Sequence, residues 1–469
     1  MAMLLKMPSS VTAGSFKNIM CPEHLAVAAI LLMAAVLGLI TPAFVGISDG
    51  QASKLVALPA AMLFGLMLLY DRRLSLMVII LFRSSADNVL DLTRLSIGSY
   101  PLGVGALING CVILIAILLV LEKPRQAPAW AFGAWLPFLA VALFGVVVSP
   151  VKGDALRAFL AILSYAAMFI AGFHCARTRE EFRQCIKLAV WSSLVPVLYS
   201  AVDLALHHSE AGYRVRSTFN HPNLLAFYTT VMIGLTFYLL KSLPKRAPAA
   251  HNVCLSLYLI ALLGVLALTQ TRSAWGATAI SFGLYAVLFE RRYLIYMCVL
   301  GAVALMIPGV LDRFTDLEQG NTVSTYANLN SFAWRVYLWQ CALDWMQPSS
   351  YLLGNGFNSF KEYSGLFFPL AGKIKWGAHS VYVQLMFELG ISGLLTFCWL
   401  YFKVFKGLAQ LVKTDALAAF SLILIVLNFL ICCISDNMLD YLSYAWYLWF
   451  TVGAGCALAR LPAENGRGV

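Results

Sequence analysis

Arg272 is the clearest candidate for an anion-binding side chain in this sequence. It lies in a short polar turn, Thr269-Gln270-Thr271-Arg272-Ser273, between two long apolar stretches. An arginine at such a place often extends toward the lipid headgroups and holds the turn there. Its planar guanidinium is also well suited to bind a phosphate through two parallel hydrogen bonds. Both interpretations stay open for Arg272 taken alone.

Two further arginines, Arg214 and Arg216, precede the apolar stretch that begins at Pro222. Pro222 suits the first turn of a helix, and the asparagine and histidine before it are suitable caps. An ordinary capped helix explains those residues, but it does not explain two arginines. A helix N-terminus beside two arginines predicts a site for a diphosphate.

His379 precedes another long apolar stretch. A histidine there is often a cap or a surface residue; the alternative is a general base, because imidazole titrates near neutral pH. Glu388 lies about two helical turns further on. A carboxylate inside a membrane helix is a functional candidate, although an ion pair within the bundle explains it equally well. Arg335, Asp436 and Asp440 are weaker candidates.

The composition indicates which elements must position these side chains. Hydrophobic residues make up 61% and charged residues 12% of the chain, against about 45–50% and about 25% in soluble domains. The solvent of such a chain is largely lipid, so we expect a single all-α polytopic membrane domain over 1–469 with twelve to fourteen transmembrane helices. The apolar runs predict helices over residues 25–47, 55–70, 74–90, 102–121, 131–148, 155–175, 185–206, 222–240, 252–270, 274–289, 293–310, 380–402, 416–434 and 443–459. Arg83 and Asp87 interrupt the third run, which predicts a helix that breaks.

The charge pattern predicts an orientation. The net charge of +11 is first a topology signal in a membrane protein, and no nucleic-acid partner is expected. Alternate short loops are rich in lysine and arginine, which predicts that both termini are cytoplasmic. The arginines named above and His379 then share the outer face, where they would form an anion-binding cavity. The eleven cysteines have no metal-binding spacing, so neither a zinc site nor a disulfide is expected.

Residues 311–378 contain no continuous span and are expected to form a loop outside the membrane. Within this loop Trp334, Leu338, Cys341 and Trp345 recur at helical spacing. They predict an amphipathic helix that lies on the membrane surface or caps the bundle. A turn is expected at Gly354-Asn355-Gly356.

An ordered set of motifs resembles the O-antigen ligase and polymerase superfamily. The set is Arg216-x-x-Phe219-x-x-Pro222-Asn223, Thr271-Arg272-Ser273, Trp334-Arg335, Gly354-x-Gly356 and His379-Ser380-x-Tyr382-x-Gln384-x-x-x-Glu388-Leu389-Gly390. The resemblance covers residues 210–400 closely. Ser380 stands where many relatives carry asparagine, which bears on acceptor positioning.

The resemblance implies a bacterial inner-membrane glycosyltransferase of GT-C-like fold. Members move a glycan from undecaprenyl diphosphate onto a sugar hydroxyl at the periplasmic face, and the resemblance implies no metal or other cofactor. By analogy Arg216 and Arg272 bind the diphosphate, and His379 deprotonates or orients the acceptor hydroxyl for an inverting attack. The supporting residues implied are Arg214 and Arg335 at the diphosphate, with Asn223, Tyr382 and Glu388 nearby.

Two activities of this family stay open. A polymerase extends a lipid-linked repeat unit, whereas a ligase transfers the finished chain to lipid A-core; we favour an exopolysaccharide or O-antigen polymerase. Besides these substrates, membrane lipids and a chain-length regulator are the expected partners. A flippase for lipid-linked oligosaccharides is the rival from another class, but it should show related halves and charges at mid-membrane depth, and the sequence has no internal repeat.

Overall fold

The computed structural model describes residues 65, 67–92, 94–97, 100–207, 209–210, 212–244, 246–306 and 330–461. The chain divides into two compact units, Met1–Val78 and Ile79–Val469. The helix predicted over 25–47 lies outside the described residues, and the one over 55–70 lies outside them almost entirely. All candidate residues belong to the second unit.

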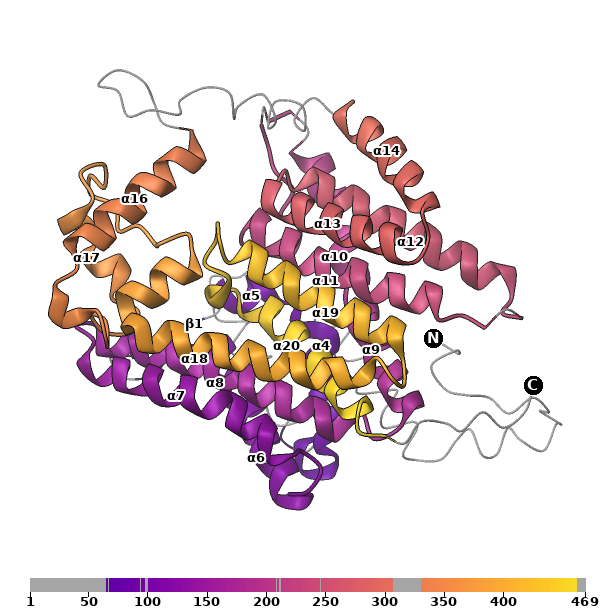
Figure 1. Ribbon diagram of the computed structural model, residues 1–469, viewed down its shortest axis with the longest axis horizontal. Coiled ribbons are helices and arrows are strands. Elements are labelled where there is room, and N and C mark those ends of the chain that lie inside the picture. Colours follow the sequence, from indigo (N-terminus) through magenta and orange to yellow (C-terminus); the bar gives the residue numbers. More distant parts are fainter. Residues whose placement is uncertain are drawn as a thin grey trace. The chain divides into compact units, whose positions relative to one another are not determined.

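Helices form nearly all of the described structure (Figure 1). They are α4 (Arg72–Arg83), α5 (Asp87–Leu92), α6 (Val104–Glu122), α7 (Ala129–Val148), α8 (Lys152–Cys175), α9 (Arg179–Ser192), α10 (Leu194–Leu206), α11 (Pro222–Lys241), α12 (Ala249–Leu268), α13 (Arg272–Leu288), α14 (Arg292–Leu305), α16 (Ser331–Trp345), α17 (Phe360–Phe367), α18 (Val381–Leu411), α19 (Ala416–Cys432) and α20 (Leu442–Leu458). Two short 3₁₀ turns, η1 (Pro348–Ser350) and η2 (Met438–Asp440), accompany them.

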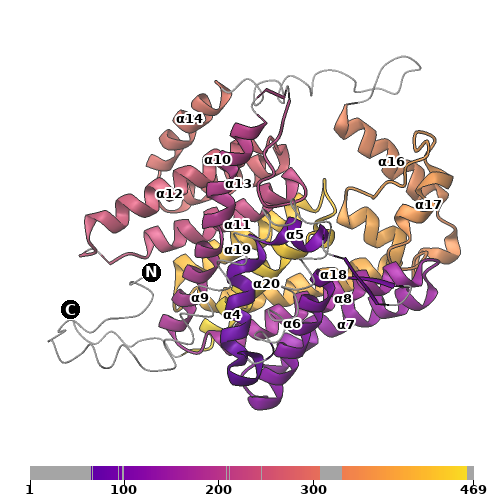
Figure 2. The same ribbon diagram turned by 180° about the vertical axis from the view of Figure 1, so that it is seen from behind.

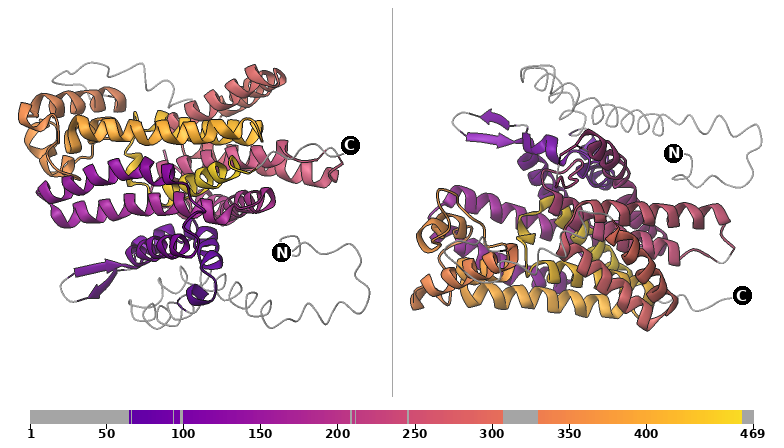
Figure 3. Two further views of the ribbon diagram at one scale, coloured as in Figure 1. Left: turned by 60° about the horizontal axis from the view of Figure 1, so that its bottom comes forward. Right: turned by 90° about the horizontal axis from the view of Figure 1, so that it is seen from above.

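The described helices confirm an all-α polytopic membrane protein. Seven helical segments in the described ranges are long and apolar enough to cross a membrane. The figure of twelve to fourteen spans stays a prediction. One feature was not predicted: β1 (Arg94–Ile97) and β2 (Tyr100–Gly103) pair antiparallel, and they project from the neighbouring helices (Figure 3).

Two predicted helices are interrupted, each for a local reason. The run over 74–90 breaks between Arg83 and Asp87, where α4 ends and α5 begins. The run over 185–206 divides into α9 and α10 beside Pro196. A proline has no N–H to donate to the carbonyl four residues earlier, and the Ser192 carbonyl accepts from the Ser84 hydroxyl instead, at 2.9 Å.

The break after α4 contains a buried ion pair. The Arg83 guanidinium lies 2.7 Å from the Asp87 carboxylate, and both side chains are about 5% exposed or less. The Ser443 hydroxyl donates to the same carboxylate at 2.8 Å, and the Trp446 ring centroid lies 5.6 Å from the guanidinium. These contacts offset the cost of burying two charges. They also attach the break to α20.

Helix α19 connects the elements that carry the candidate residues, because it packs against α11, α13, α18 and α20. Helix α8 forms a second group of contacts, with α6, α7 and α20 (Figure 2). Gly172 in α8 allows a close approach to α20, since an added Cβ would lie 2.6 Å from the Phe450 carbonyl oxygen. Small residues let membrane helices approach in this way.

The predicted amphipathic helix is α16, and its apolar face packs on protein. Leu338 is fully buried in a cluster with Phe360 and Phe367 of α17 and Phe387 of α18, and Trp334 and its neighbours on α16 flank this cluster. Figure 1 shows α16 and α17 together at one end of α18. This packing agrees with a helix that caps the bundle; its placement relative to the membrane stays a prediction.

Candidate functional site

Arg214 joins the loop before α11 to the turn between α12 and α13. Its Nε donates to the Thr269 carbonyl oxygen at 2.9 Å. One terminal nitrogen donates to the Asn223 Oδ1 at 2.6 Å and to the Thr271 hydroxyl at 2.9 Å. These bonds hold the guanidinium against the protein, so Arg214 positions the turn that carries Arg272.

Asn223 extends this connection to the segment before α20. Its Nδ2 donates to the Asp436 carboxylate at 2.6 Å. Asp436 is 3% exposed and also accepts from the Asn437 amide at 2.8 Å and the Tyr441 hydroxyl at 3.0 Å. Asp436 is therefore a buried and fully engaged carboxylate, not a solvated loop charge. A continuous polar chain runs from Thr271 through Arg214 and Asn223 to Asp436.

The start of α11 is built as the sequence predicts. Pro222 occupies the first turn, and His221 is the capping residue, whose Nδ1 accepts from the Asn223 amide at 3.1 Å. The cap fixes the backbone at Asn223, and with it the side chain that links Arg214 to Asp436.

Asp203, near the end of α10, holds the segment that carries Arg216. Its carboxylate accepts from the backbone amides of Arg216 at 3.0 Å and Ser217 at 2.9 Å, and from the Tyr213 hydroxyl at 2.8 Å. Burial and the bond to Asp203 raise the pKa of Tyr213 to about 12, against an opposing effect of Arg216. The Arg216 side chain itself is exposed.

Asp203 was not among the residues predicted from the sequence. The sequence does contain a signal for it. A carboxylate inside an apolar helix is a functional candidate, as was argued for Glu388. Asp203 is only 4% exposed, and it positions an arginine loop without reaching the surface itself.

Arg272 and Arg335 come together through α16. Arg272 is the first residue of α13, and its guanidinium donates to the Ser331 hydroxyl at 2.7 Å. Ser331 is the first residue of α16, and Arg335 lies four residues further on the same face of that helix. Arg335 thus lies one helical turn from the residue that binds Arg272, although the two arginines differ by 63 in the printed numbering.

His379 is held from two sides. The Trp339 indole of α16 donates to the Ala378 carbonyl at 2.6 Å, and the Val381 amide donates to the Cys433 carbonyl at 2.9 Å. The Trp334 ring meets the imidazole edge to face, with centroids 6.1 Å apart. His379 also has a φ of 49°, a conformation that non-glycine residues rarely adopt. Packing on both sides therefore fixes the position of the imidazole.

Charged side chains from several elements surround His379. Burial lowers the pKa of His379, and the positive charges of Arg335 and Lys361 lower it further, as does His221. The Asp436 carboxylate acts in the opposite direction. The net lowering favours a neutral imidazole at neutral pH, the form that can accept a proton.

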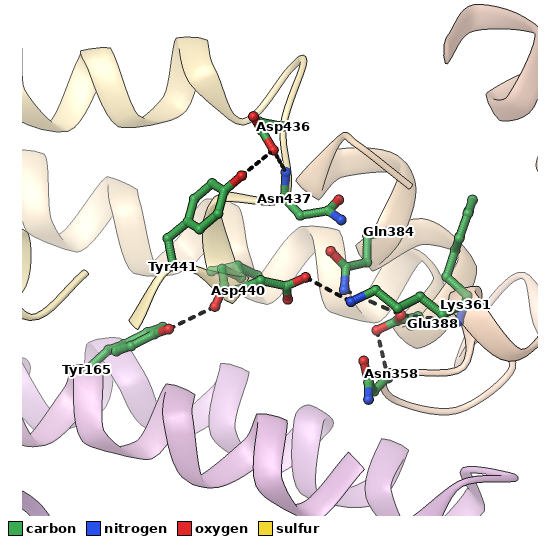
Figure 4. Close-up of polar contacts among 11 residues, drawn as sticks. Tyr165, Asn358, Lys361, Gln384, Glu388, Asp436, Asn437, Asp440 and Tyr441 are labelled. Atoms are coloured by element: carbon green, nitrogen blue, oxygen red, sulfur yellow. Dashed lines mark hydrogen bonds and ion pairs between the residues drawn. The ribbon is translucent and has the colours of Figure 1, made fainter. Parts of the chain in front are cut away.

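Glu388 is buried at 1% exposure and orders the loop before α17. Its carboxylate accepts from the backbone amides of Asn358 at 2.8 Å and Phe360 at 3.3 Å, and from the Gln384 amide at 3.4 Å (Figure 4). No side chain in the described part of the chain forms an ion pair with it. The expected alternative of an ion pair is therefore replaced by hydrogen bonds to the loop.

The same loop docks on a break in α18. Gly390 interrupts the helix with a φ of 65°, and an added Cβ there would lie 2.5 Å from the Leu352 carbonyl carbon. The Gly356 amide donates to the Glu388 carbonyl at 3.0 Å, and the Ile391 amide to the Tyr351 carbonyl at 2.8 Å. The glycines of the Gly354-x-Gly356 and Glu388-Leu389-Gly390 motifs thus permit one close backbone contact.

Tyr382, one of the predicted supporting residues, contacts α19. Its hydroxyl donates to the Leu430 carbonyl of α19 at 2.9 Å, and its ring meets Phe397 edge to face. Tyr382 therefore contributes to the packing of α18 on α19. Across the ranges that the structure describes, no group of three or more His, Cys, Asp or Glu side chains is placed to hold a metal ion.

The comparisons with known proteins extend this picture. No curated protein matches the chain. Residues 257–398 match the O-antigen ligase family, and this segment contains Arg272, Arg335, His379 and Glu388. That family implies a glycosyltransferase-like enzyme, a ligase or a polymerase, that works on lipid-linked glycans. The match covers the part of the chain that carries most of the motifs, and it supports their resemblance to the O-antigen ligase and polymerase superfamily.

Proposed function

We propose that the protein transfers a glycan from undecaprenyl diphosphate to a sugar hydroxyl at the periplasmic face of a bacterial inner membrane. The acceptor in this proposal is a lipid-linked repeat unit, which makes the protein a polymerase. The observation that carries the proposal is the contact of His379 with Trp334 of α16. The same helix carries Arg335, and its first residue binds Arg272. One base and several cations are what such a transfer requires.

The cations act on the leaving group. Diphosphate departs readily only when its developing negative charge is stabilised, and preorganised donors do this without rearranging during the reaction. Arg272, Arg335 and Arg216 are the three arginines for this role. Arg214 supports them indirectly, because its bonds to Thr269 and Thr271 fix the turn before Arg272.

The bond changes then follow. The acceptor hydroxyl oxygen forms a bond to the anomeric carbon of the donor sugar, while His379 takes the hydroxyl proton. The bond between that carbon and the diphosphate oxygen breaks, and its electron pair leaves with the diphosphate. Attack from the face opposite the leaving group inverts the anomeric configuration. The lowered pKa of His379 keeps the imidazole unprotonated before the step.

A ligase is the second candidate, and the description of the matched family favours it. Its acceptor would be lipid A-core, and its donor chemistry would be identical. The two candidates therefore differ only in the acceptor.

Deletion of the gene followed by glycan analysis tests both candidates. Single repeat units on the final acceptor, with longer chains lost, would support the polymerase. Full-length polymer retained on the lipid carrier would support the ligase. Glycans of unchanged length and attachment would contradict the proposed function.

A further inference from the structure

A cavity lies between α8, α18, η2 and the loop before α17. It has a volume of about 290 Å³ and is lined by residues that include Gln384, Glu388, Lys361 and Asp440. Small-ligand sites have volumes of about 300 to 1,000 Å³, so this cavity matches a single small ring. The arginines assigned to the diphosphate do not line it.

Gln384 gives the first indication of what fills the cavity. Its side chain is 8% exposed, and its Nε2 donates to the Glu388 carboxylate at 3.4 Å. Its Oε1 has no hydrogen-bond partner among the described residues. A buried acceptor without a partner is costly, on the order of 1–3 kcal/mol. A ligand that fills the cavity is therefore expected to donate a hydrogen bond to the Gln384 Oε1.

The charges around the cavity indicate a neutral ligand. The lining includes two carboxyl groups, Glu388 and Asp440, and two basic side chains, Lys361 and Arg157. The Lys361 ammonium lies 3.4 Å from the Asp440 carboxylate (Figure 4), and both side chains are partly exposed. An ionised diphosphate has no hydrogen to donate to Gln384 Oε1 or to the Asp440 carboxylate, whereas a sugar hydroxyl can donate to either group and accept from an ammonium.

Apolar side chains complete the lining. Phe357 and Leu385 lie on the wall of the cavity. Apolar walls with a few placed polar groups are typical of sites that bind small molecules. A pyranose ring has both C–H surfaces and hydroxyl groups, and it would use both kinds of wall.

The cavity adjoins the segment that carries His379. An added Cβ on Gly377 would lie 3.3 Å from the Lys361 Cε and 2.5 Å from the Asn437 Nδ2. Gly377 precedes His379 by two residues. A ring bound beside Lys361 is therefore close to the backbone that holds the imidazole.

We propose that this cavity is the acceptor subsite and binds one neutral sugar ring, the ring that offers the attacking hydroxyl. This inference rests on the proposed glycosyl transfer. Gln384 Oε1 and the Asp440 carboxylate accept from ring hydroxyls, and Lys361 donates to another. The arginines bind the donor, and the cavity selects the acceptor.

Saturation-transfer NMR on the purified full-length protein in nanodiscs tests the subsite. The probes are the methyl glycosides of glucose, galactose, mannose and N-acetylglucosamine, with methyl glucuronide as the anionic comparison. At least one neutral glycoside should bind the native protein. Binding should weaken about tenfold in Gln384→Leu, the effect of one lost hydrogen bond of about 1.4 kcal/mol.

A control variant and a replacement variant accompany Gln384→Leu. Thr396→Val changes a polar residue further along α18 whose hydroxyl bonds only to its own helix, and it should bind as the native protein does. If Gln384→Leu aggregates, Asp440→Asn on the opposite wall replaces it. Absence of binding by every neutral glycoside, equal binding by native and cavity variants, or binding of the glucuronide alone would each overturn the subsite.

The two proposals fail in different ways. Arg272→Lys should lose glycan transfer and keep glycoside binding. If transfer survives in His379→Ala while glycoside binding still depends on Gln384, the transfer mechanism is wrong and a sugar site remains. If transfer requires His379 but no glycoside binds, the acceptor subsite is wrong and the transfer mechanism stands.

Discussion

The Arg272 guanidinium donates to the Ser331 hydroxyl at 2.7 Å, and this bond joins the first residue of α13 to the first residue of α16. Arg335 lies one turn further along α16, and its charge acts on His379. One hydrogen bond thus connects the two ends of the candidate site.

Removal of either central side chain should abolish the reaction. Loss of a general base lowers rates by about 10²–10⁴-fold, so His379→Ala should reduce transfer in that range. Arg272→Ala should be equally severe, and Arg272→Lys should also fail, because an ammonium cannot form the bidentate contact of a guanidinium. The measurement is glycan transfer in membranes that contain equal amounts of each variant.

The control for these variants is Arg125→Ala, which removes an exposed arginine from the loop between α6 and α7. It should leave transfer unchanged. Full activity in both His379→Ala and Arg272→Ala would show that the assignment of these residues is wrong.

Asp203 should act as a positioning residue for Arg216. Asp203→Ala removes a carboxylate that accepts from two backbone amides, and hydrogen bonds to charged groups contribute about 1.5–3 kcal/mol each. The loop at Arg216 should lose its fixed conformation, so the KM for the lipid-linked donor should rise about tenfold or more while kcat falls less. Donor titration in detergent micelles measures the two constants.

Asp154→Ala is the comparison for Asp203→Ala, because Asp154 is an exposed carboxylate at the start of α8. A lower kcat with an unchanged KM in Asp203→Ala would argue against a positioning role at the donor.

The pH dependence should report the surroundings of His379. A base works in its unprotonated form, so activity should fall as the pH drops through the pKa of His379. Burial and Arg335 lower that pKa below the ordinary value, which is about 6.5, so the loss should occur only below that pH.

Arg335→Gln removes one of the lowering charges and should move the acid limb of kcat/KM to higher pH. Asp436→Asn removes the opposing charge and should move it to lower pH. Profiles of both variants with an acid limb at the native position would exclude His379 as the titrating base.

Gly390 should tolerate no side chain. Gly390→Ala places a Cβ 2.5 Å from the Leu352 backbone at a φ of 65°, and backbone strain of this kind costs about 1–3 kcal/mol before any overlap is counted. The variant should unfold at lower temperature and lose activity, because the loop held by Glu388 cannot dock. Thermal unfolding in detergent checks this.

Gly264→Ala in α12 is the matched control, since an added Cβ there meets nothing within 4 Å. It should be neutral or slightly stabilising, as alanine favours a helix. Equal unfolding temperatures for Gly390→Ala and the native protein would contradict the docking argument.

The sequence alone determined the features that depend on local pattern. Apolar runs predicted most of the described helices within a few residues, because the hydrocarbon thickness fixes their length and composition. The interruption at Arg83 and Asp87 predicted the break after α4, and the spacing of Trp334 and Leu338 predicted α16. Successive membrane helices run in opposite directions, so alternate loops lie on the same face. The sequence therefore also predicted that Arg214, Arg272 and His379 would lie at one end of the bundle.

Only the tertiary structure decided what each of these residues contacts. Arg214 bonds to Thr269 and Thr271, Glu388 orders the loop at Asn358, and Tyr382 faces α19. No local pattern encodes these partners, because hydrogen bonds between side chains distant in sequence depend on how whole helices pack. For the same reason neither Asp203 nor Lys361 was singled out from the sequence. Their importance arises from neighbours that only the folded chain brings within reach.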